Sequence, residues 1–378
     1  MSKIIYSFLF FWLLFSSCSS SRKITETTEI HQLKFLDQYV VPFNQQFEST
    51  TIGGLSGIDF NSVKKEYYLI SDDRSQKNPA RFYTANILIK QDKIDSVIFL
   101  QTIFLKNKTG NLYPNSQLDP FHTPDPEALR YNAKSNQFIW SSEGERIVNS
   151  QKIVLENPAI TEVDSKGNFI DTFQLPSQLL MSTGEFGPRQ NEVFEGLTFS
   201  ENNKSLFVSV EEPLYQDGPR AGTLDSSGVT RIIKFDMATK NPVAQYAYLI
   251  DPVAFPPITP SSFKINGISD ILSVSENHFL VVERSFSTGR LGCTIKVFLA
   301  DISSAENVNE IASLKNKSIK MASKKLLLNM DDLGIYIDNI EGVTFGPTLS
   351  NGKKSLIFIA DNNFNPLERT QFLLFEIE

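Results

Sequence analysis

Short apolar runs separated by polar turns recur along the whole chain, and no long stretch shows the 3.6-residue periodicity of an amphipathic helix. Five segments share one pattern: an apolar run opened by an acidic or small residue, a polar turn, and a second apolar run closed by an acid. They are residues 53–74, 126–145, 194–213, 265–285 and 340–363. Each segment predicts an antiparallel hairpin.

The hairpins recur at a regular spacing. Taking Ser56, Glu127, Glu195, Asp270 and Glu341 as equivalent points, the steps are 71, 68, 75 and 71 residues. Further strand-like runs between the hairpins, at 81–89, 94–104, 159–163, 169–175, 230–235 and 243–249, bring each repeat to about four strands. A radial array of four-stranded sheets suits such repeats, because each sheet is buried against its neighbours and few edges stay exposed.

The sequence therefore predicts an all-β fold, a single propeller of five blades. Six blades would follow if an insertion hides a degenerate repeat, and two separate β-domains are less well supported. After the fifth hairpin only one clear strand remains, at 371–377, so the last blade is one strand short. The run at 32–41 is the candidate that completes it and closes the ring.

The N-terminus predicts a location. The apolar stretch from Ile4 to Phe15 follows Lys3; it is too short to span a bilayer and is typical of a secretory signal. It ends in Leu-Phe-Ser-Ser-Cys18, which resembles a bacterial lipobox; an ordinary signal peptide with a chance cysteine is the alternative. We predict a signal peptide at 1–17, a lipidated Cys18, a tether at 18–30 and a propeller domain at 31–378. The protein would then be extracytoplasmic, anchored to a bacterial membrane on its periplasmic or outer-membrane face.

Composition narrows the function. The net charge is −7, or −8 once residues 1–17 and their single lysine are removed, and this negative charge argues against nucleic-acid binding. Three histidines leave little room for a zinc site, and two cysteines cannot form a disulfide framework. If Cys18 is lipidated, Cys293 is a free thiol. We expect a monomer.

The acids within the repeats predict a shared site. Glu127 with Glu143, Glu195 with Glu211, Asp270 with Glu283, and Glu341 with Asp361 open and close four hairpins, and Ser56 with Asp72 the first. Because a hairpin turn lies midway between paired residues, we expect each opening residue to face its closing partner at one common rim. Like charges this close repel one another, so the cluster requires divalent cations, arginines or raised pKa values.

The ligand chemistry favours Ca²⁺ or Mg²⁺, since the oxygens are hard and neither histidine nor thiolate takes part. Arg74, Arg146 and Arg284 follow closing acids and suit phosphate recognition, with surface salt bridges as the alternative. His122 lies five residues before Glu127 and is a weaker candidate for the same rim. The sequence holds no nucleophile elbow, P-loop, dinucleotide-binding glycine pattern or His-x-Glu-x-x-His motif.

Several motifs carry a family resemblance. GGLSGIDF, YYLISDDRS with ARFYTANI, DPEALRY, WSSEGE, NEVFEGLTF, and NIEGVTF with FIADNNF resemble the phytase-like domain family of secreted bacterial proteins, "esterase-like activity of phytase". The resemblance extends from about residue 45 to the end. It implies a propeller whose repeated Glu and Asp residues form a phosphoester-hydrolysing site. Ser56 stands where an acid would complete the set.

The function we expect is hydrolysis of a small phosphoester, dependent on Ca²⁺ or Mg²⁺, at one end of the propeller channel. The predicted metal ligands are Asp72, Glu127, Glu143, Glu195, Glu211, Asp270, Glu283, Glu341 and Asp361. A water activated by the metals would attack phosphorus, with Glu195, Glu127, Glu341, Arg74 and Arg284 as the catalytic residues. One alternative is a non-catalytic propeller that binds calcium, glycan or protein at the same rim. The other is a purely architectural role, since an acid at a strand end can simply accept backbone N–H bonds from the next blade.

Overall fold

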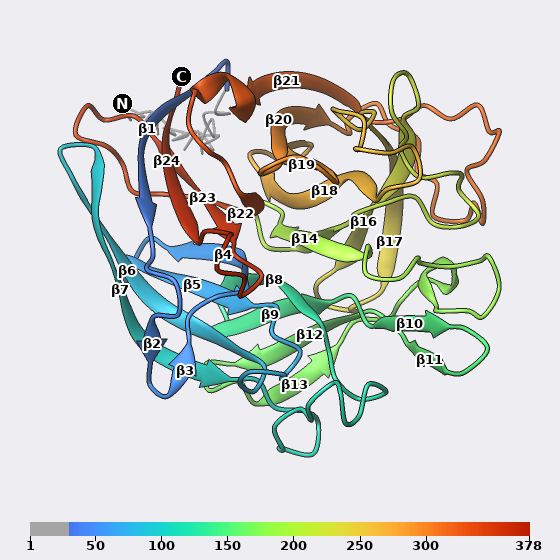
Figure 1. Cartoon of the computed structure of the whole chain (residues 1–378), viewed down its shortest axis with the longest axis horizontal. Coiled ribbons are helices and arrows are strands. Elements are labelled where there is room, and N and C mark those ends of the chain that lie inside the picture. The colour runs from blue at the N-terminus through green and yellow to red at the C-terminus, as the bar shows by residue number, and fades with distance from the viewer. Residues whose placement is uncertain (1–29) are drawn as a thin grey trace, which may run out of the picture.

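A computed structural model describes residues 30–378, which form five four-stranded antiparallel sheets around a common axis (Figure 1). The predicted five-bladed propeller is confirmed. Within this range the helical elements are two 3₁₀ turns, η1 (Ser177–Leu179) and η2 (Met330–Leu333). The predicted signal peptide, lipidated Cys18 and all but the last residue of the predicted tether lie outside the described residues. Across residues 30–378, no helix combines the length and apolar character needed to cross a bilayer.

The strands of each blade pair in their order along the chain, apart from the last strand of blade 5. Blade 1 contains β4 (Leu55–Asn61), β5 (Glu66–Ser71), β6 (Arg81–Lys90) and β7 (Lys93–Phe104). Blade 2 contains β8 (Pro126–Asn132), β9 (Gln137–Ser142), β12 (Ala159–Asp164) and β13 (Phe169–Thr172). Blade 3 contains β14 (Phe194–Phe199), β15 (Ser205–Val210), β16 (Gly228–Asp236) and β17 (Pro242–Ile250). Blade 4 contains β18 (Lys264–Ser273), β19 (His278–Ser287), β20 (Thr294–Asp301) and β21 (Ser323–Asn329). Blade 5 contains β22 (Asn339–Phe345), β23 (Ser355–Asp361), β24 (Gln371–Ile377) and β1 (Leu33–Val40).

The two ends of the described chain meet in blade 5. Strand β1 pairs antiparallel with β24, with Leu33 opposite Ile377 and Val40 opposite Gln371. The prediction that an N-terminal strand completes the last blade is therefore confirmed. This pairing joins the first and last strands of the domain, so opening the ring requires breaking a whole strand ladder.

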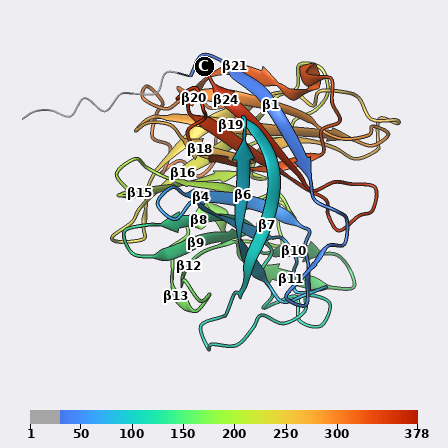
Figure 2. The same ribbon diagram turned by 90° about the vertical axis from the view of Figure 1, so that its left-hand side faces the viewer.

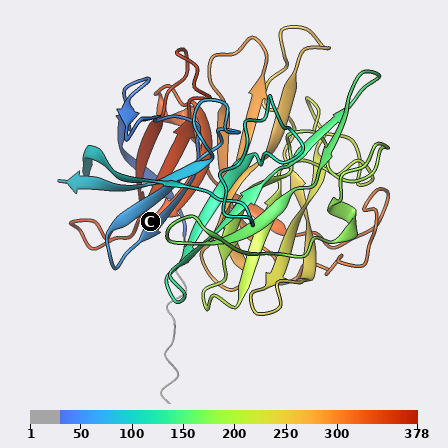
Figure 3. The same cartoon turned by 90° about the horizontal axis from the view of Figure 1, so that it is seen from below.

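The hydrophobic core lies between blades, because side chains on one strand alternate between two neighbouring blades. In β23, Leu356 and Phe358 pack toward blade 4, while Ile357 and Ile359 pack toward blade 1. Strands buried on both faces need continuous apolar runs, which is the pattern in the sequence. Figure 3 shows the molecule edge-on, with the inner strands running between its two faces.

The two faces of the propeller differ in their connections. Short turns join the first and second strands of each blade at one face, which we call the turn rim. The second strands end at the opposite face, the acid rim, where the connecting segments are mostly longer. A small hairpin of β10 (Glu145–Val148) and β11 (Ile153–Glu156) projects there, between β9 and β12 (Figure 2). A second small hairpin, β2 (Gln46–Phe47) with β3 (Thr50–Thr51), precedes blade 1.

The prediction that opening and closing acids face each other directly is wrong. Glu127 lies in a bulge between the pairs Pro126–Ser142 and Leu129–Trp140, so it does not pair with Glu143. Asp361 pairs with Asn339 rather than Glu341. Every first strand carries a bulge near its opening acid or its equivalent, and the bulge adds one residue to the ladder. The midpoint rule assumes an uninterrupted ladder, so it misplaced the register. A bulge also re-aims the side chain at its position.

Candidate metal centre

Carboxylates from four blades gather at the acid rim, beside the propeller axis. We define the acidic cluster as Asp72, Asp125, Glu127, Glu143, Glu195, Glu211, Glu341 and Asp361. Most of its members are buried; Glu143 and Glu211 are 1% exposed and Asp361 0%, while Asp72 is half-buried. Each interacts electrostatically with other members of the cluster. The predicted convergence of acids from different repeats is present in blades 1, 2, 3 and 5.

Two sets of three carboxylates are close enough to hold a cation. In one set, oxygens of Asp125, Glu127 and Glu143 all lie within 4.8 Å of one another; in the other, those of Glu143, Glu195 and Glu211 do. Calcium–oxygen bonds are about 2.3–2.6 Å long, so oxygens up to about 5 Å apart can share one Ca²⁺. Mg²⁺ demands shorter bonds and a stricter octahedron, so calcium tolerates this spacing more readily.

Asp125 belongs to the cluster but was missed from the sequence. It lies two residues before Glu127, and in an extended chain the side chains of residues i and i+2 point to the same side. The signal was therefore present as an Asp-Pro-Glu sequence at the start of the second hairpin. Glu145, which opens the β10–β11 hairpin, was missed as well, although it follows Glu143 by the same interval.

Some buried oxygens of the cluster have no partner in the protein. Glu143 accepts a hydrogen bond at Oε1 from the Val193 amide, while its buried Oε2 has none. Asp361 accepts at Oδ2 from the Asn363 amide, 2.9 Å away, and its Oδ1 is likewise buried without a partner. An unpaired buried carboxylate oxygen costs free energy unless a cation or a proton satisfies it. The donor set therefore fits a bound divalent cation.

Burial and mutual repulsion raise the pKa of the cluster's carboxyl groups. The pKa values of Asp72, Asp125, Glu211 and Glu341 rise to about 7, chiefly because burial disfavours the charged form. Arg284 partly opposes that effect at Glu211 and Glu341. The pKa values of Glu127, Glu143, Glu195 and Asp361 lie well above their usual range, first through burial and then through neighbouring carboxylates. Near neutral pH the cluster must therefore hold protons or cations.

Two of the three predicted arginines border the acidic cluster. Arg284 places Nη2 2.8 Å from Glu211 Oε1 and Nη1 3.2 Å from Glu341 Oε1. Arg74 places Nη1 2.7 Å from Glu145 Oε2 and Nε 3.5 Å from Asp125 Oδ2, and its buried Nη2 has no hydrogen-bond partner. The two guanidinium groups thus lie beside different members of the cluster.

The third predicted arginine has a different setting. Arg146 donates to the carbonyls of Ser182 and Gly184 and lies 4.8 Å from the centroid of the Tyr215 ring. It therefore holds the segment between β13 and β14 in place.

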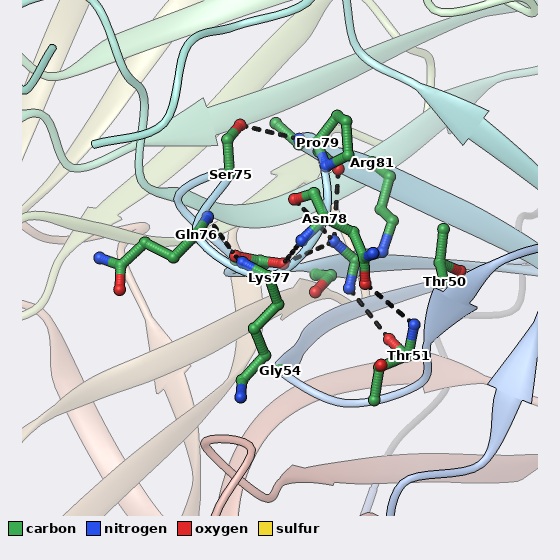
Figure 4. A network of polar contacts seen from close by, with 12 residues as sticks. Thr50, Thr51, Gly54, Ser75, Gln76, Lys77, Asn78, Pro79 and Arg81 are labelled. Atoms are coloured by element: carbon green, nitrogen blue, oxygen red, sulfur yellow. Dashed lines mark hydrogen bonds and ion pairs between the residues drawn. The ribbon is translucent and has the colours of Figure 1, made fainter. Parts of the chain in front are cut away.

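A polar network holds the loop that carries Asp72 and Arg74 (Figure 4). Asp73 lies between them and accepts hydrogen bonds from the amides of Gln76, Lys77 and Asn78. The fully buried Arg81 places Nη1 2.9 Å from Asp73 Oδ2 and donates through Nη2 to the Thr51 carbonyl at 3.0 Å. Because this network fixes the middle residue, it positions the two neighbouring side chains at the rim.

In blade 4 the structure places two predicted ligands away from the cluster. The sequence predicts Asp270 and Glu283 as the equivalents of Glu195 and Glu211, but the bulge residue is Ser269, and Arg284 occupies the position of Glu211. The sequence alignment was therefore shifted by one residue, and in a strand such a shift moves each side chain to the other face. At the acid rim, blade 4 therefore contributes the positively charged Arg284, whereas the other blades contribute carboxylates at the equivalent position.

Asp270 instead forms a buried ion pair deeper in the propeller. Its carboxylate lies 2.9 and 3.0 Å from Arg130 Nη2 and accepts the Val343 amide at 2.8 Å. Arg130, from blade 2, also donates to the carbonyls of Ile58 in blade 1 and Val343 in blade 5. This one guanidinium therefore links blades 1, 2, 4 and 5.

Both carboxylate oxygens of Glu283 are occupied by hydrogen bonds and an ion pair to residues outside the acidic cluster. Its two oxygens accept from Tyr248 Oη at 2.9 Å, the Asp251 amide at 2.8 Å, Asn266 Nδ2 at 2.9 Å and Lys324 Nζ at 2.5 Å. With four donors and no free oxygen, this carboxylate serves the packing of blade 4.

Two further predicted positions have structural contacts. The Ser56 hydroxyl donates to the Glu127 carbonyl at 2.6 Å and so links blade 1 to blade 2. His122 has a largely exposed side chain and contacts Asp119 at 2.9 Å, outside the acidic cluster.

Comparison with known protein families assigns the chain to one family. The sequence profile of the phytase-like family, described as "esterase-like activity of phytase", matches residues 50–364. The chain belongs to the phytase-like family. The matched region begins at β3 and ends just after β23, so it includes all eight residues of the acidic cluster.

No curated protein sequence matches this phytase-like chain. Solved structures resemble it distantly. An α-L-arabinofuranosidase from Lactobacillus brevis aligns with 10% identity and a TM-score of 0.45, covering 86% of this chain and 91% of the other. A protein of unknown function from Dyadobacter fermentans aligns with 13% identity and a TM-score of 0.43, covering 92% and 100%. A gluconolactonase from Xanthomonas campestris aligns with 10% identity and a TM-score of 0.33, covering 91% and 89%. These likenesses are too distant to inform the function of this phytase-like protein.

Proposed function

We propose that this phytase-like protein is a phosphoester hydrolase that depends on a divalent cation, with its site in the acidic cluster. The observation that carries the proposal is the pair of carboxylate sets, in which buried oxygens such as Glu143 Oε2 have no partner in the protein. Membership of a family described by a phytase-related esterase activity supports the same reaction class. Calcium is the cation we favour, for the reasons of bond length and geometry given above.

The protein's own residues have distinct roles in this proposal. Asp125, Glu127, Glu143, Glu195 and Glu211 would hold the cation. Bound there, the cation would offset their charge, polarise a phosphoryl oxygen and lower the pKa of water. Arg74 is the better placed arginine for a phosphoryl oxygen, because its Nη2 is not engaged by the protein. Asp72, half-buried with a pKa raised to about 7, can hold or release a proton at the mouth of the site.

Arg284, Glu341 and Asp361 complete the rim. Arg284 is bound to Glu211, Glu341 and Asn339, so it balances the charge of the carboxylates around it. Glu341 also accepts from Asn339 Nδ2 at 2.7 Å, which limits its freedom to move toward a ligand. We therefore place these three residues in support of the site.

The test is turnover of nitrophenyl phosphate and bis-nitrophenyl phosphate by the purified protein, with and without EDTA. We expect nitrophenol release with at least one substrate, its loss in EDTA and its recovery with added CaCl₂. Glu195→Gln should abolish the activity. The matched control is Glu201→Gln, an exposed acid on the turn of the same hairpin. Equal activity of these two variants would refute the proposal.

A second candidate function is a non-catalytic calcium-binding propeller. The deep burial of the cluster favours it, because Glu143 and Glu211 are each only 1% exposed. This candidate predicts a calcium-dependent rise in melting temperature without turnover of any phosphoester. Melting curves and substrate assays in the same buffer separate the two candidates.

We also propose that Cys18 is lipidated and that the protein is an extracytoplasmic monomer with no nucleic-acid partner. The lipobox-like sequence supports the anchor and the net charge of −7 supports the absence of nucleic acid. The chain enters the described domain at the turn rim, where the Ile377 amide donates to the Lys354 carbonyl at 3.0 Å. The acid rim is the opposite face. Labelling with a radioactive fatty acid should mark the protein, and Cys18→Ser should remove the label.

A further inference from the structure

Glu143 is the one residue common to both sets of three carboxylates. It follows β9 in blade 2, and its Oε1 is held by the amide of Val193, at the entrance to blade 3. Its Oε2 has no hydrogen-bond partner in the protein, and the whole residue is only 1% exposed, so solvent does not satisfy this oxygen either. We infer that the centre takes two divalent cations and that Glu143 bridges them. This inference deepens the proposed function and rests on its dependence on a cation.

The remaining carboxylates divide between the two positions. Asp125 and Glu127, from blade 2, complete one set, and Glu195 and Glu211, from blade 3, complete the other. Glu127 and Glu195, the first-strand acids of the two sets, are 7% and 6% exposed, so each set contains one acid that is less deeply buried than Glu143. Each cation would thus have two carboxylates of its own and share the third.

Charge favours two cations over one. The five carboxylates carry −5 when ionised, so one divalent cation leaves −3 and two leave −1. Arg74 lies 3.5 Å from Asp125 in the first set, and Arg284 lies 2.8 Å from Glu211 in the second. An arginine therefore flanks each end of the centre. The other three acids of the acidic cluster add −3 and the two arginines add +2, so for the whole cluster one divalent cation leaves −4 and two leave −2. Two cations therefore relieve more of the repulsion among these buried carboxylates than one.

A shared ligand couples the two positions. Binding of the first cation fixes Glu143 and removes its cost of desolvation, so the second cation meets a prepared carboxylate. We therefore expect both sites to fill within a narrow range of calcium concentration, and the loss of Glu143 to weaken both.

The test is isothermal titration of the chelator-treated full chain with CaCl₂ at pH 7.5. We expect two cations per chain in the unaltered protein and in the Glu201→Gln control. Asp125→Asn and Glu195→Gln should each leave one cation, since each removes a ligand of a single set. Glu143→Gln should weaken both sites by at least tenfold, and Glu143→Asp, which keeps the charge, should retain two weaker sites.

A stoichiometry of one in the unaltered protein, or loss of only one site in Glu143→Gln, would overturn the inference. Circular dichroism of every variant verifies folding, and Glu143→Asp keeps the test informative if Glu143→Gln does not fold. Turnover with one bound cation would refute the bridged pair and leave the hydrolase proposal intact. Two bound cations without turnover would support the bridged pair and refute the hydrolase proposal.

Discussion

Removing divalent cations should make the protein less stable as the pH rises from 5 to 7. The folded-state pKa values of Asp72, Asp125, Glu211 and Glu341 are raised to about 7, against unfolded values of about 4. Between these limits the folded chain keeps protons that the unfolded chain has released. Because stability falls with pH wherever the folded state holds more protons, the free energy of unfolding must decline across this window.

The magnitude follows from the number of retained protons. A group with a pKa of about 7 keeps most of its proton at pH 6, and because Asp72 interacts with Asp125 and Glu211 with Glu341, we count one retained proton for each pair as a lower limit. Each retained proton changes the free energy of unfolding by about 1.4 kcal/mol per pH unit, so two give a slope of about −3 kcal/mol per pH unit. A bound cation offsets the charge of the deprotonated carboxylates, so calcium at 100 times its dissociation constant should restore about 3 kcal/mol for each cation bound.

Urea unfolding at pH 5, 6 and 7, in EDTA and in CaCl₂, measures this effect. The fluorescence of Trp140 is a suitable signal, because this side chain is 1% exposed and lies three residues before Glu143. Stability that stays constant or rises with pH in EDTA would show that the carboxylates are not held in an unfavourable charged state. The acidic cluster would then have no need of a cation.

Other predictions separate architecture from ligand binding. Arg130→Met should lower the free energy of unfolding by about 3–5 kcal/mol, because it leaves Asp270 buried and unpaired, while calcium stoichiometry stays unchanged in titrations. Glu283→Gln should reduce the melting temperature without altering calcium affinity, and reduced affinity would mean that Glu283 belongs to the centre after all. Deleting residues 30–40 should expose the edge of β24 and yield aggregates on size-exclusion chromatography, and a monodisperse product would show that β1 is dispensable.

The fold could be predicted because it is repetitive. Five hairpins at similar spacing, with strands buried on both faces, leave few architectures other than a propeller. The shortage of one strand after residue 361 also predicted the role of β1, since a four-stranded blade needs a partner for β24. These inferences depend on the number and length of apolar runs, which tolerate errors of one residue.

The candidate site was less predictable because it depends on register. The bulge in each first strand shifts the ladder by one residue, and nothing in the alternation of apolar residues marks it. In blade 4 the sequence favours Asp270 and Glu283, whereas the rim positions belong to Ser269 and Arg284. Asp125 was recoverable from its spacing to Glu127, but the sharing of Glu143 between two carboxylate sets required coordinates.

The most direct test of the account is a diffraction experiment on crystals soaked in CaCl₂. An anomalous difference map should show density among Asp125, Glu127 and Glu143, and again among Glu143, Glu195 and Glu211. Density confined to exposed acids, with none between these side chains, would contradict the assignment of the acidic cluster as a metal centre.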